Sequence, residues 1–361
     1  MATDKLKLPK QLPSSTHEVI VLLEEVYMTV EDLDTSPRSH ELISYHHVTK
    51  PHRIETRIQC ASIVIAVQAS ITSESMGEAP YLKCIIAPGV GTDHIDLDEC
   101  HRRGIRVVNS PGSTSLAVSE HALGLYFAAR RKMVTLHHVL RDVDENGENV
   151  WKREGNAAGI MRMANGKPPA ALGQEVAGIF GYGFIGKHLA TLCKSLGMKV
   201  LISERKKSAA DTAPPPTRIG DGGSNVTRIP FGEVVRSATV LFITCPLAPE
   251  TLNMIDSPEF EVMRPEVVVV NVSRGGVVNS AALIRALREN RISGAAVDVY
   301  DKEPASSSHE DTLLAEESKS TNLTLSPHVG YFSGQTVLAL KNMTKEHISN
   351  YISGNEDNFV V

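Results

Sequence analysis

The sequence predicts an α/β protein built from two doubly wound domains. Short apolar runs alternate with helical patterns along most of the chain, which is typical of parallel sheets covered by helices. The chain has 361 residues, more than one hydrophobic core usually spans, so two domains are expected. A glycine-rich turn at 181–186 follows one apolar run and opens a helical pattern, as at the start of a doubly wound unit.

The first hundred residues predict a small βαβ domain. Their apolar runs have the length and composition of strands, and a helical pattern near 51–60 separates two of them. The expected strands are 18–23, 42–45, 62–67 and 82–86.

One long helix is expected next, over Ser115–Leu136, because apolar residues recur with helical spacing and Ser115 can cap its start. This helix would cross between the domains. Residues 142–169, rich in Asn, Gly, Lys and Pro around the only tryptophan, Trp151, predict an irregular connector.

The second domain is predicted to begin with a strand at Glu175. Further strands are expected over 199–203, 239–244, 266–272, 294–297 and 322–325, with helices over 187–196 and 280–290. The insertion 206–228 has few periodic apolar residues and predicts a mobile surface loop. The last helical pattern, 334–352, has no partner left in the second sheet, so it is expected to fold back onto the first domain.

Charge and cysteine content narrow the class of partner. The formal net charge is −5, without acidic or basic blocks, which gives no reason to expect nucleic acid or an anionic membrane and favours small molecules. Five scattered cysteines without a CxxC pair predict reduced thiols and no metal site. The amino terminus lacks the apolar core of a signal peptide, and no apolar run approaches the ~20 residues of a membrane helix, so we expect a cytoplasmic protein with no membrane partner.

The glycine-rich turn predicts a dinucleotide site. Gly181 permits the tight turn, Gly183 lets the backbone approach a pyrophosphate, and Gly186 lets the helix pack closely on the strand. The next strand ends at Glu204, where a carboxylate can accept hydrogen bonds from ribose hydroxyls, which favours NAD. Arg205 could instead hold the 2′-phosphate of NADP, so NADP stays the alternative, although the carboxylate repels a phosphate at short range.

Three charged residues each follow a strand-like run late in the chain: Arg274, Glu303 and His328. Alone, each would be an ordinary strand end or turn residue. Because ligands bind beyond the carboxyl ends of parallel strands, we expect the three to act together. A guanidinium can hold a carboxylate and polarise a carbonyl, an imidazole can exchange the proton, and a carboxylate can hold that imidazole in position, which suits a small 2-oxo acid.

The order of these motifs resembles the D-isomer-specific 2-hydroxyacid dehydrogenase family, most closely its glycerate dehydrogenase and glyoxylate/hydroxypyruvate reductase members. The resemblance rests on LKCIIAPGVGTDHIDL and RRGIRVVNSPG within 82–112, VSEHALGL, GYGFIG, CPLAPET, NVSRGG, GAAVDVYDKEP and SPHVG. It implies two Rossmann-like domains with an active-site cleft between them. Residues 1–112 with 333–361 would form a flavodoxin-like, substrate-binding (catalytic) domain, and 113–332 an NAD(P)-binding Rossmann domain. It also implies a homodimer, consistent with the long helix pattern.

The resemblance assigns roles to individual residues. Arg274 would bind the substrate carboxylate and carbonyl, His328 would be the acid/base, Glu303 would hydrogen-bond His328, and Asp298 would meet the nicotinamide carboxamide. The remaining expected contacts are Phe184 and Ile185 with the pyrophosphate, Cys245 and Pro246 with the cofactor, and the backbone of Gly89, Val90 and Gly91 with the substrate carboxylate.

Two other functions remain open from the sequence. A 3-phosphoglycerate dehydrogenase-like enzyme is disfavoured, because Ala66, Val67 and Gln68 are uncharged where such enzymes carry arginines, so an unphosphorylated glyoxylate or hydroxypyruvate type of substrate is expected. An NAD(H)-sensing corepressor or scaffold of the same fold would show little turnover. The stretch 305–322 between Glu303 and His328 is polar, serine-rich and long, and predicts a looped-out surface segment.

Overall fold

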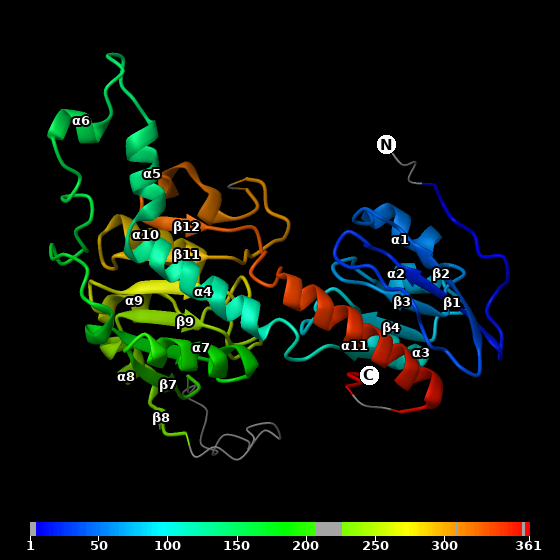
Figure 1. The fold of residues 1–361 in the computed structure, drawn as a ribbon. Helices are drawn as coiled ribbons and strands as arrows, with labels where there is room; N and C mark the ends of the chain where they lie inside the picture. The colour runs from blue at the N-terminus through cyan, green and yellow to red at the C-terminus, as the bar shows by residue number, and fades with distance from the viewer. Residues whose placement is uncertain (1–4, 207–225, 308, 356–357) are drawn as a thin grey trace. The chain divides into compact units, whose positions relative to one another are not determined.

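A computed structural model describes residues 5–206, 226–307, 309–355 and 358–361. The chain divides into two units, one formed by Met1–Thr114 with Phe332–Val361 and the other by Ser115–Tyr331 (Figure 1). Each unit has its own parallel sheet.

The first unit contains a five-stranded parallel sheet in the order β2-β1-β3-β4-β5, the flavodoxin-like order. Most of its central strand residues are apolar and fully buried, as expected for parallel strands covered on both faces. The strands are β1 His17–Leu22, β2 Ser39–Ser44, β3 Ile63–Ile65, β4 Cys84–Ala87 and β5 Arg106–Asn109.

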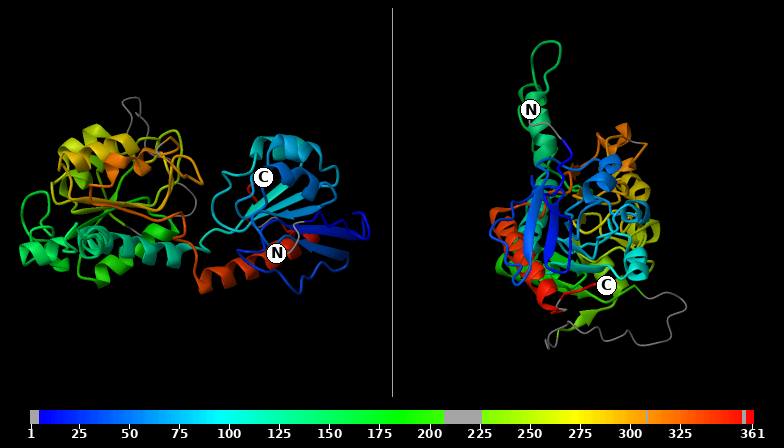
Figure 2. Two further views of the ribbon diagram at one scale, coloured as in Figure 1. Left: turned by 90° about the horizontal axis from the view of Figure 1, so that it is seen from above. Right: turned by 90° about the vertical axis from the view of Figure 1, so that its right-hand side faces the viewer.

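Helices from both ends of the chain cover this sheet. Leu340 and Ile348 of α11 are buried in one core with Ile20 and Leu22 of β1, so the last helix does pack on the first sheet. Figure 2 shows α11 on one face and the other helices on the opposite face. The helices are α1 Pro51–Ile58, α2 Ser73–Gly77, α3 Leu97–Arg103 and α11 Gly334–Ser353.

The second unit contains a seven-stranded parallel sheet in the order β12-β11-β10-β9-β6-β7-β8. The strand order reverses between β6 and β9, which is the point where ligands bind in doubly wound sheets. The strands are β6 Val176–Phe180, β7 Lys199–Ser203, β8 Arg228–Ile229, β9 Val240–Ile243, β10 Val268–Asn271, β11 Gly294–Val297 and β12 Leu323–Leu325.

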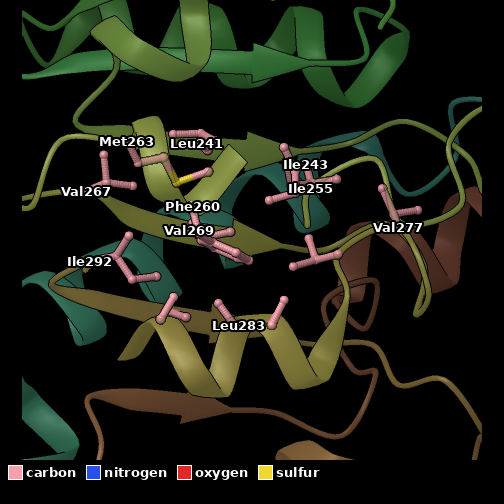
Figure 3. Close-up of a cluster of buried hydrophobic side chains, with 14 of the residues drawn as sticks. Leu241, Ile243, Ile255, Phe260, Met263, Val267, Val269, Val277, Leu283 and Ile292 are labelled. Carbon is pink, nitrogen blue, oxygen red and sulfur yellow. The ribbon is translucent and has the colours of Figure 1, made fainter. Parts of the chain in front are cut away.

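Two hydrophobic cores lie on opposite faces of this second sheet. On one face, Leu241 and Val269 of the strands pack against Phe260 of α9 and Leu283 of α10 (Figure 3). On the other face, Tyr126 of α4 and Leu189 of α7 pack over the sheet. The helices are α4 Ser115–Arg130, α5 Met133–Arg141, α6 Val150–Glu154, α7 Phe184–Ser195, α8 Phe231–Ser237, α9 Ser257–Val262 and α10 Ser280–Arg288, with short 3₁₀ turns η1 Leu172–Gln174, η2 Thr312–Leu314 and η3 Glu316–Ser318.

The prediction of one helix over Ser115–Leu136 is wrong. The chain breaks after α4, because Lys132 adopts a left-handed conformation with φ 49°, and α5 starts in a new direction. The two helices also differ in burial: α4 buries Ala122, Tyr126 and Ala129, whereas α5 has no buried residue. The connector that follows is irregular apart from α6.

The prediction of a looped-out surface segment over 305–322 is also wrong for its second half. Leu313 of η2 is only 2 % exposed and belongs to the core beneath α10. Asp311 is 3 % exposed and accepts hydrogen bonds from the backbone N–H groups of Leu313 (2.8 Å) and Asp301 (2.8 Å). Of the other predicted insertion, 206–228, residues 207–225 lie outside the described residues.

Candidate active site

The glycine-rich turn between β6 and α7 has two positions where only glycine fits. Gly181 has φ +96°, and a Cβ there would lie 2.6 Å from the backbone nitrogen of Cys245. A Cβ on Gly186 would lie 2.1 Å from the carbonyl oxygen of Gly181. The turn is therefore packed against both the start of α7 and the segment that follows β9.

Thr244, which sequence reasoning did not single out, fastens this turn to the neighbouring strand. Its Oγ1 donates to the carbonyl oxygen of Gly181 (2.8 Å). Its backbone N–H donates to the carbonyl oxygen of Phe180 (2.8 Å). These bonds hold Cys245 and the glycine-rich turn side by side at the strand-order reversal. Burial raises the pKa of the Cys245 thiol to about 11, so the thiol is neutral at physiological pH.

The turn fits the pyrophosphate of a dinucleotide. Gly183, in contrast to Gly181 and Gly186, faces open space, because a Cβ there would meet nothing within 4 Å. No side chain caps the amino terminus of α7, which leaves its first N–H groups to an anion. Phe184 is exposed and Ile185 is half-buried at this end of the helix.

The residues after β7 form the predicted selectivity position for the cofactor ribose. Glu204 is half-buried and Arg205 is exposed. Lys206 turns to other partners: its ammonium pairs with Glu259 (2.8 Å) and donates to the carbonyl oxygen of Met254 (2.9 Å). The positive charge of Lys206 is thus already balanced within the protein.

Asp298, directly after β11, is the centre of a hydrogen-bonded cluster. It is 3 % exposed; its Oδ1 accepts from Ser326 Oγ (2.6 Å) and its Oδ2 from the backbone N–H of Gly330 (2.9 Å). His121 Nε2 of α4 lies 2.9 Å from Ser326 Oγ and 3.3 Å from Asp298 Oδ1. Burial acts to raise the pKa of Asp298, but hydrogen bonds from His121, Ser326, Gly330 and Val329 outweigh it and lower that pKa below its usual value.

His328 and Glu303 lie in direct contact at the same edge of the sheet. His328 follows β12, has φ 49°, and its Nδ1 lies 2.5 Å from Oε2 of Glu303. The other oxygen of Glu303 accepts from the backbone N–H of Tyr300 (2.9 Å), so the carboxylate is fixed from two sides. Both side chains are about one-third exposed, at 32 % each, which leaves the imidazole accessible.

Arg274 follows β10 in a loop that packs against the loop carrying Glu303. The Asn271 side-chain amide donates to the carbonyl oxygen of Arg274 (2.9 Å). A Cβ on Gly275 would lie 2.0 Å from the carbonyl oxygen of Tyr300, and the backbone N–H of Gly276 donates to Asp301 Oδ1 (2.7 Å). The loops after β10, β11 and β12 are thus adjacent, because these strands are neighbours in one parallel sheet.

The predicted substrate loop, Gly89 to Gly91, belongs to the first unit and follows β4. Gly89 has φ +147° with open space at its Cβ position. Its carbonyl oxygen accepts from the backbone N–H of Ser110 (2.6 Å), and that of Val90 accepts from the side chain of Asn109 (2.7 Å). These bonds fix the loop from the end of β5.

A buried carboxylate occupies the ends of β1 and β3 in the same unit. Glu24 is 0 % exposed, and its carboxylate accepts from the backbone N–H groups of Val67 (2.7 Å) and Gln68 (3.0 Å). The side chain of Gln68 in turn accepts from the Tyr27 hydroxyl (2.8 Å).

The family is decided by the match of residues 133–330, more than half of the chain, to the family model described as D-isomer specific 2-hydroxyacid dehydrogenase, NAD binding domain. The chain belongs to the D-isomer-specific 2-hydroxyacid dehydrogenase family. Similar relatives include a glycerate dehydrogenase of Methylorubrum extorquens, which is 29 % identical over 93 % of this chain and 98 % of the relative. A glyoxylate reductase of Pyrococcus furiosus is 32 % identical over 74 % of this chain and 72 % of the relative.

A D-3-phosphoglycerate dehydrogenase of Archaeoglobus fulgidus is 32 % identical over 81 % of this chain. The match covers only 50 % of the length of that relative. A solved structure of D-lactate dehydrogenase from Aquifex aeolicus complexed with NAD and lactic acid has the same fold, with a TM-score of 0.67 at 21 % identity, covering 95 % of this chain and 99 % of that one.

Membership of the 2-hydroxyacid dehydrogenase family confirms three predictions: two parallel α/β domains, a nicotinamide cofactor, and an oxidoreductase that acts on a CH–OH group. Within the described ranges, no helix combines the length and apolarity needed to cross a membrane. In the same ranges, no three His, Cys, Asp or Glu side chains form a metal-binding group. The residues that sequence reasoning missed, His121, Ser326 and Gly330, all lie in motifs that carried the resemblance, but their mutual contact depends on tertiary structure.

Proposed function

We propose that this 2-hydroxyacid dehydrogenase reduces a small unphosphorylated 2-oxo acid of the glyoxylate or hydroxypyruvate type. The observation that carries the proposal is the 2.5 Å contact between His328 Nδ1 and Glu303 Oε2, next to the loop that carries Arg274. Together they supply an acid/base, its positioning carboxylate and a carboxylate anchor at one edge of a sheet.

Arg274, His328 and Glu303 have different proposed roles, which follow from the charge of each side chain. When bound, the reduced nicotinamide supplies a hydride. Arg274 holds the substrate carboxylate and polarises the carbonyl that is reduced. His328, protonated on both nitrogens, donates Nδ1–H to Glu303 and gives the Nε2 proton to the developing alkoxide. Glu303 keeps the imidazole oriented and stabilises its positive charge, while Asp298 offers a fixed acceptor for the nicotinamide carboxamide.

The cofactor preference is proposed to be NAD, with NADP as the alternative. The turn at Gly181, Gly183 and Gly186 would bind the pyrophosphate, with Phe184 and Ile185 against it. Cys245 and Pro246 would line the cofactor. Glu204 would accept bonds from the ribose hydroxyls and repel a 2′-phosphate. Since Lys206 is paired with Glu259, Arg205 is the only described cation of this turn left to attract that phosphate.

An unphosphorylated substrate is supported by the residues after β3. Ala66, Val67 and Gln68 carry no positive charge, and the backbone N–H groups of Val67 and Gln68 are already bonded to the Glu24 carboxylate. These three side chains would therefore offer no cation to a phosphate, and the two N–H groups are not available to bind one. The names of the glycerate dehydrogenase and glyoxylate reductase relatives favour the same substrate class.

A homodimer is also part of the proposal. The helix α5 has no buried residue, and Met133, Leu140 and Trp151 of the segment from α5 to α6 are 50–57 % exposed. A second copy of the second unit would cover this apolar surface. Light scattering that gives a monomer at micromolar concentration would contradict it. The cytoplasmic location stays a prediction from the sequence.

The decisive experiment is oxidation of NADH and NADPH with a panel of glyoxylate, hydroxypyruvate, pyruvate, branched 2-oxo acids and 3-phosphohydroxypyruvate. We expect kcat/KM to be highest for glyoxylate or hydroxypyruvate with NADH. Preference for the phosphorylated acid would establish the phosphoglycerate alternative instead. Tight NADH binding without turnover on any acid would favour the corepressor or scaffold.

Variants separate the proposed roles. His328→Ala should lower kcat by ~100-fold or more while NADH affinity stays near that of the parent. Arg274→Ala should raise KM and lower kcat together, because the guanidinium contacts both ground and transition states. His101→Ala, which removes an exposed histidine of α3, is the matched control and should leave both constants unchanged. A near-normal kcat in His328→Ala would remove that residue from the acid/base role.

A further inference from the structure

The second unit contains a polar cavity at the edge of the sheet opposite to the nucleotide turn. Its volume is about 310 Å³, at the lower end of the range for small-molecule sites. Ser293 and Asn322, which line it, stand just before β11 and β12, so the cavity lies at the amino-terminal ends of these strands. The residues proposed for catalysis follow the carboxyl-terminal ends, so this cavity is a separate place.

Three cations from three different segments line the cavity. Lys132 comes from the break between α4 and α5, Arg162 from the connector after α6, and Arg288 from the last turn of α10. No aspartate or glutamate is among the described lining residues. Neither Lys132, Arg162 nor Arg288 forms an ion pair with any carboxylate in the part of the chain that the structure describes.

The position of Lys132 is specified by the backbone. A left-handed conformation is uncommon for a lysine, and here it ends α4 and brings the side chain to the cavity. The ammonium donates to the carbonyl oxygen of Arg162 (2.8 Å). Partial burial lowers the pKa of Lys132, because no carboxylate compensates for the lost water.

Helix dipoles account for only part of this charge. The carboxyl-terminal ends of α4 and α10, beside Lys132 and Arg288, each carry a partial charge of roughly −0.5. The three side chains carry one positive charge each, and the two helix ends together offset about one of these charges. A net charge of about +2 therefore remains around the cavity. Arg162 follows an irregular segment and has no helix end to offset it; its guanidinium donates to the carbonyl oxygen of Gly166 (2.7 Å).

We propose that this cavity binds a phosphate dianion, carried by a small phosphate monoester. The charge of a dianion matches the uncompensated charge, and arginine guanidinium groups bind phosphate oxygens through paired hydrogen bonds. Asn290, two residues after α10, also lines the cavity and carries an uncharged amide that can donate hydrogen bonds. A short carbon chain would occupy the rest of the volume.

The test is calorimetric titration of the full chain saturated with NADH, so that phosphate cannot occupy the glycine-rich turn. The probes are inorganic phosphate, glycerol phosphate and acetate at pH 8 and constant ionic strength. We expect saturable binding of the two phosphates with a Kd below ~10 mM, and at least tenfold weaker binding of acetate. Tighter binding of glycerol phosphate than of inorganic phosphate supports a monoester as the ligand. Equal or weaker binding of glycerol phosphate would overturn the assignment to a monoester and leave inorganic phosphate as the ligand.

Variants connect the binding to the cavity. The double variant Arg162→Gln with Arg288→Gln changes two exposed side chains, so it should fold normally, and it should weaken phosphate binding tenfold or more. Lys132→Met should do the same. Arg131→Gln, an exposed neighbour outside the cavity, is the matched control and should bind as the parent does. An unchanged Kd in the double variant, equal binding of acetate, or no saturable binding would each overturn the proposal. If NADH does not bind, the comparison of parent and variants without NADH still tests the cavity, because these substitutions would not change phosphate binding at the glycine-rich turn.

Discussion

Substitution by alanine at two glycines of the second unit should affect different properties: fold stability at Gly275 and NADH binding at Gly183. Gly275 has no room for a Cβ, which would lie 2.0 Å from the Tyr300 carbonyl oxygen, whereas Gly183 faces open space with an ordinary φ of −81°. We expect Gly275→Ala to destabilise the fold by about 1–3 kcal/mol, since the clash is with backbone.

Gly183→Ala should leave the free energy of unfolding within about 0.5 kcal/mol of the parent. It should nevertheless weaken NADH binding tenfold or more, because the methyl group occupies the space proposed for the pyrophosphate. Urea unfolding and fluorescence titration with NADH measure the two effects. Equal NADH affinity in Gly183→Ala and the parent would argue against that placement of the cofactor.

Asp298 should make the stability of the second unit depend on pH. Its pKa is lowered in the folded state, so its stabilising contribution is present above the ordinary value of about 3.9 and is lost as the pH falls through the folded-state value. Asp298→Asn should cost about 1–3 kcal/mol at pH 7, because an amide cannot accept all of these hydrogen bonds.

The difference between parent and Asp298→Asn should narrow as the pH falls below about 3.9, because the unfolded parent then binds a proton on this carboxyl while the folded carboxylate, with its lowered pKa, still resists protonation. Urea unfolding at pH 7 and pH 3.5 measures it, with Asp98→Asn, an exposed position on α3, as the control. A difference that stays constant over this range would show that the charge of Asp298 has no part in its contribution.

Among the elements, η2 is predicted to be part of the structural core. Leu313→Ala should destabilise the second unit by about 2–5 kcal/mol, because the side chain is 2 % exposed among core residues. Thr312→Ala changes the exposed neighbour in the same turn and should cost less than about 0.5 kcal/mol. Similar stability of the two variants would mean that the segment is dispensable.

The elements that could be predicted from the sequence are those with a strong local pattern. Buried parallel strands are continuous apolar runs, so the apolar runs of β10, β11 and β12 predict that Arg274, Glu303 and His328 follow neighbouring strand ends. The break at Lys132 and the burial of Leu313 could not be predicted. The helical periodicity of the sequence continues across Lys132, so it gives no sign of the break. The burial of Leu313 depends on how a polar segment packs against α10.

At the scale of the whole molecule, NADH should protect the two units unequally. Ligand binding at 100 times Kd stabilises a binding unit by about 2.7 kcal/mol. We expect hydrogen exchange to slow in the glycine-rich turn and after β9, and to change little in β1 and β2 of the first unit. Exchange that slows only around Gly89 would place the cofactor elsewhere.

The two-unit division follows from chain length and from the two series of strands, both visible in the sequence. Contacts between distant segments are less accessible to such reasoning. Asn322 illustrates this, because its amide donates to the carbonyl oxygens of both Ala129 and Ser293, and so joins the end of α4 to the start of β11. Nothing in the local pattern around Asn322 marks that role.

If the substrate is unphosphorylated, as proposed, the buried carboxylate of Glu24 restricts the substitutions by which this chain could acquire a phosphorylated one. An arginine introduced at Gln68 would have this carboxylate beside its own backbone N–H, and an ion pair within the protein would compete with the ligand. Removing Glu24 first would deprive Val67 and Gln68 of their acceptor. The effects of an arginine at position 68 and of losing the Glu24 carboxylate are therefore coupled. Neither substitution alone would be expected to give a phosphate-binding site without a loss elsewhere.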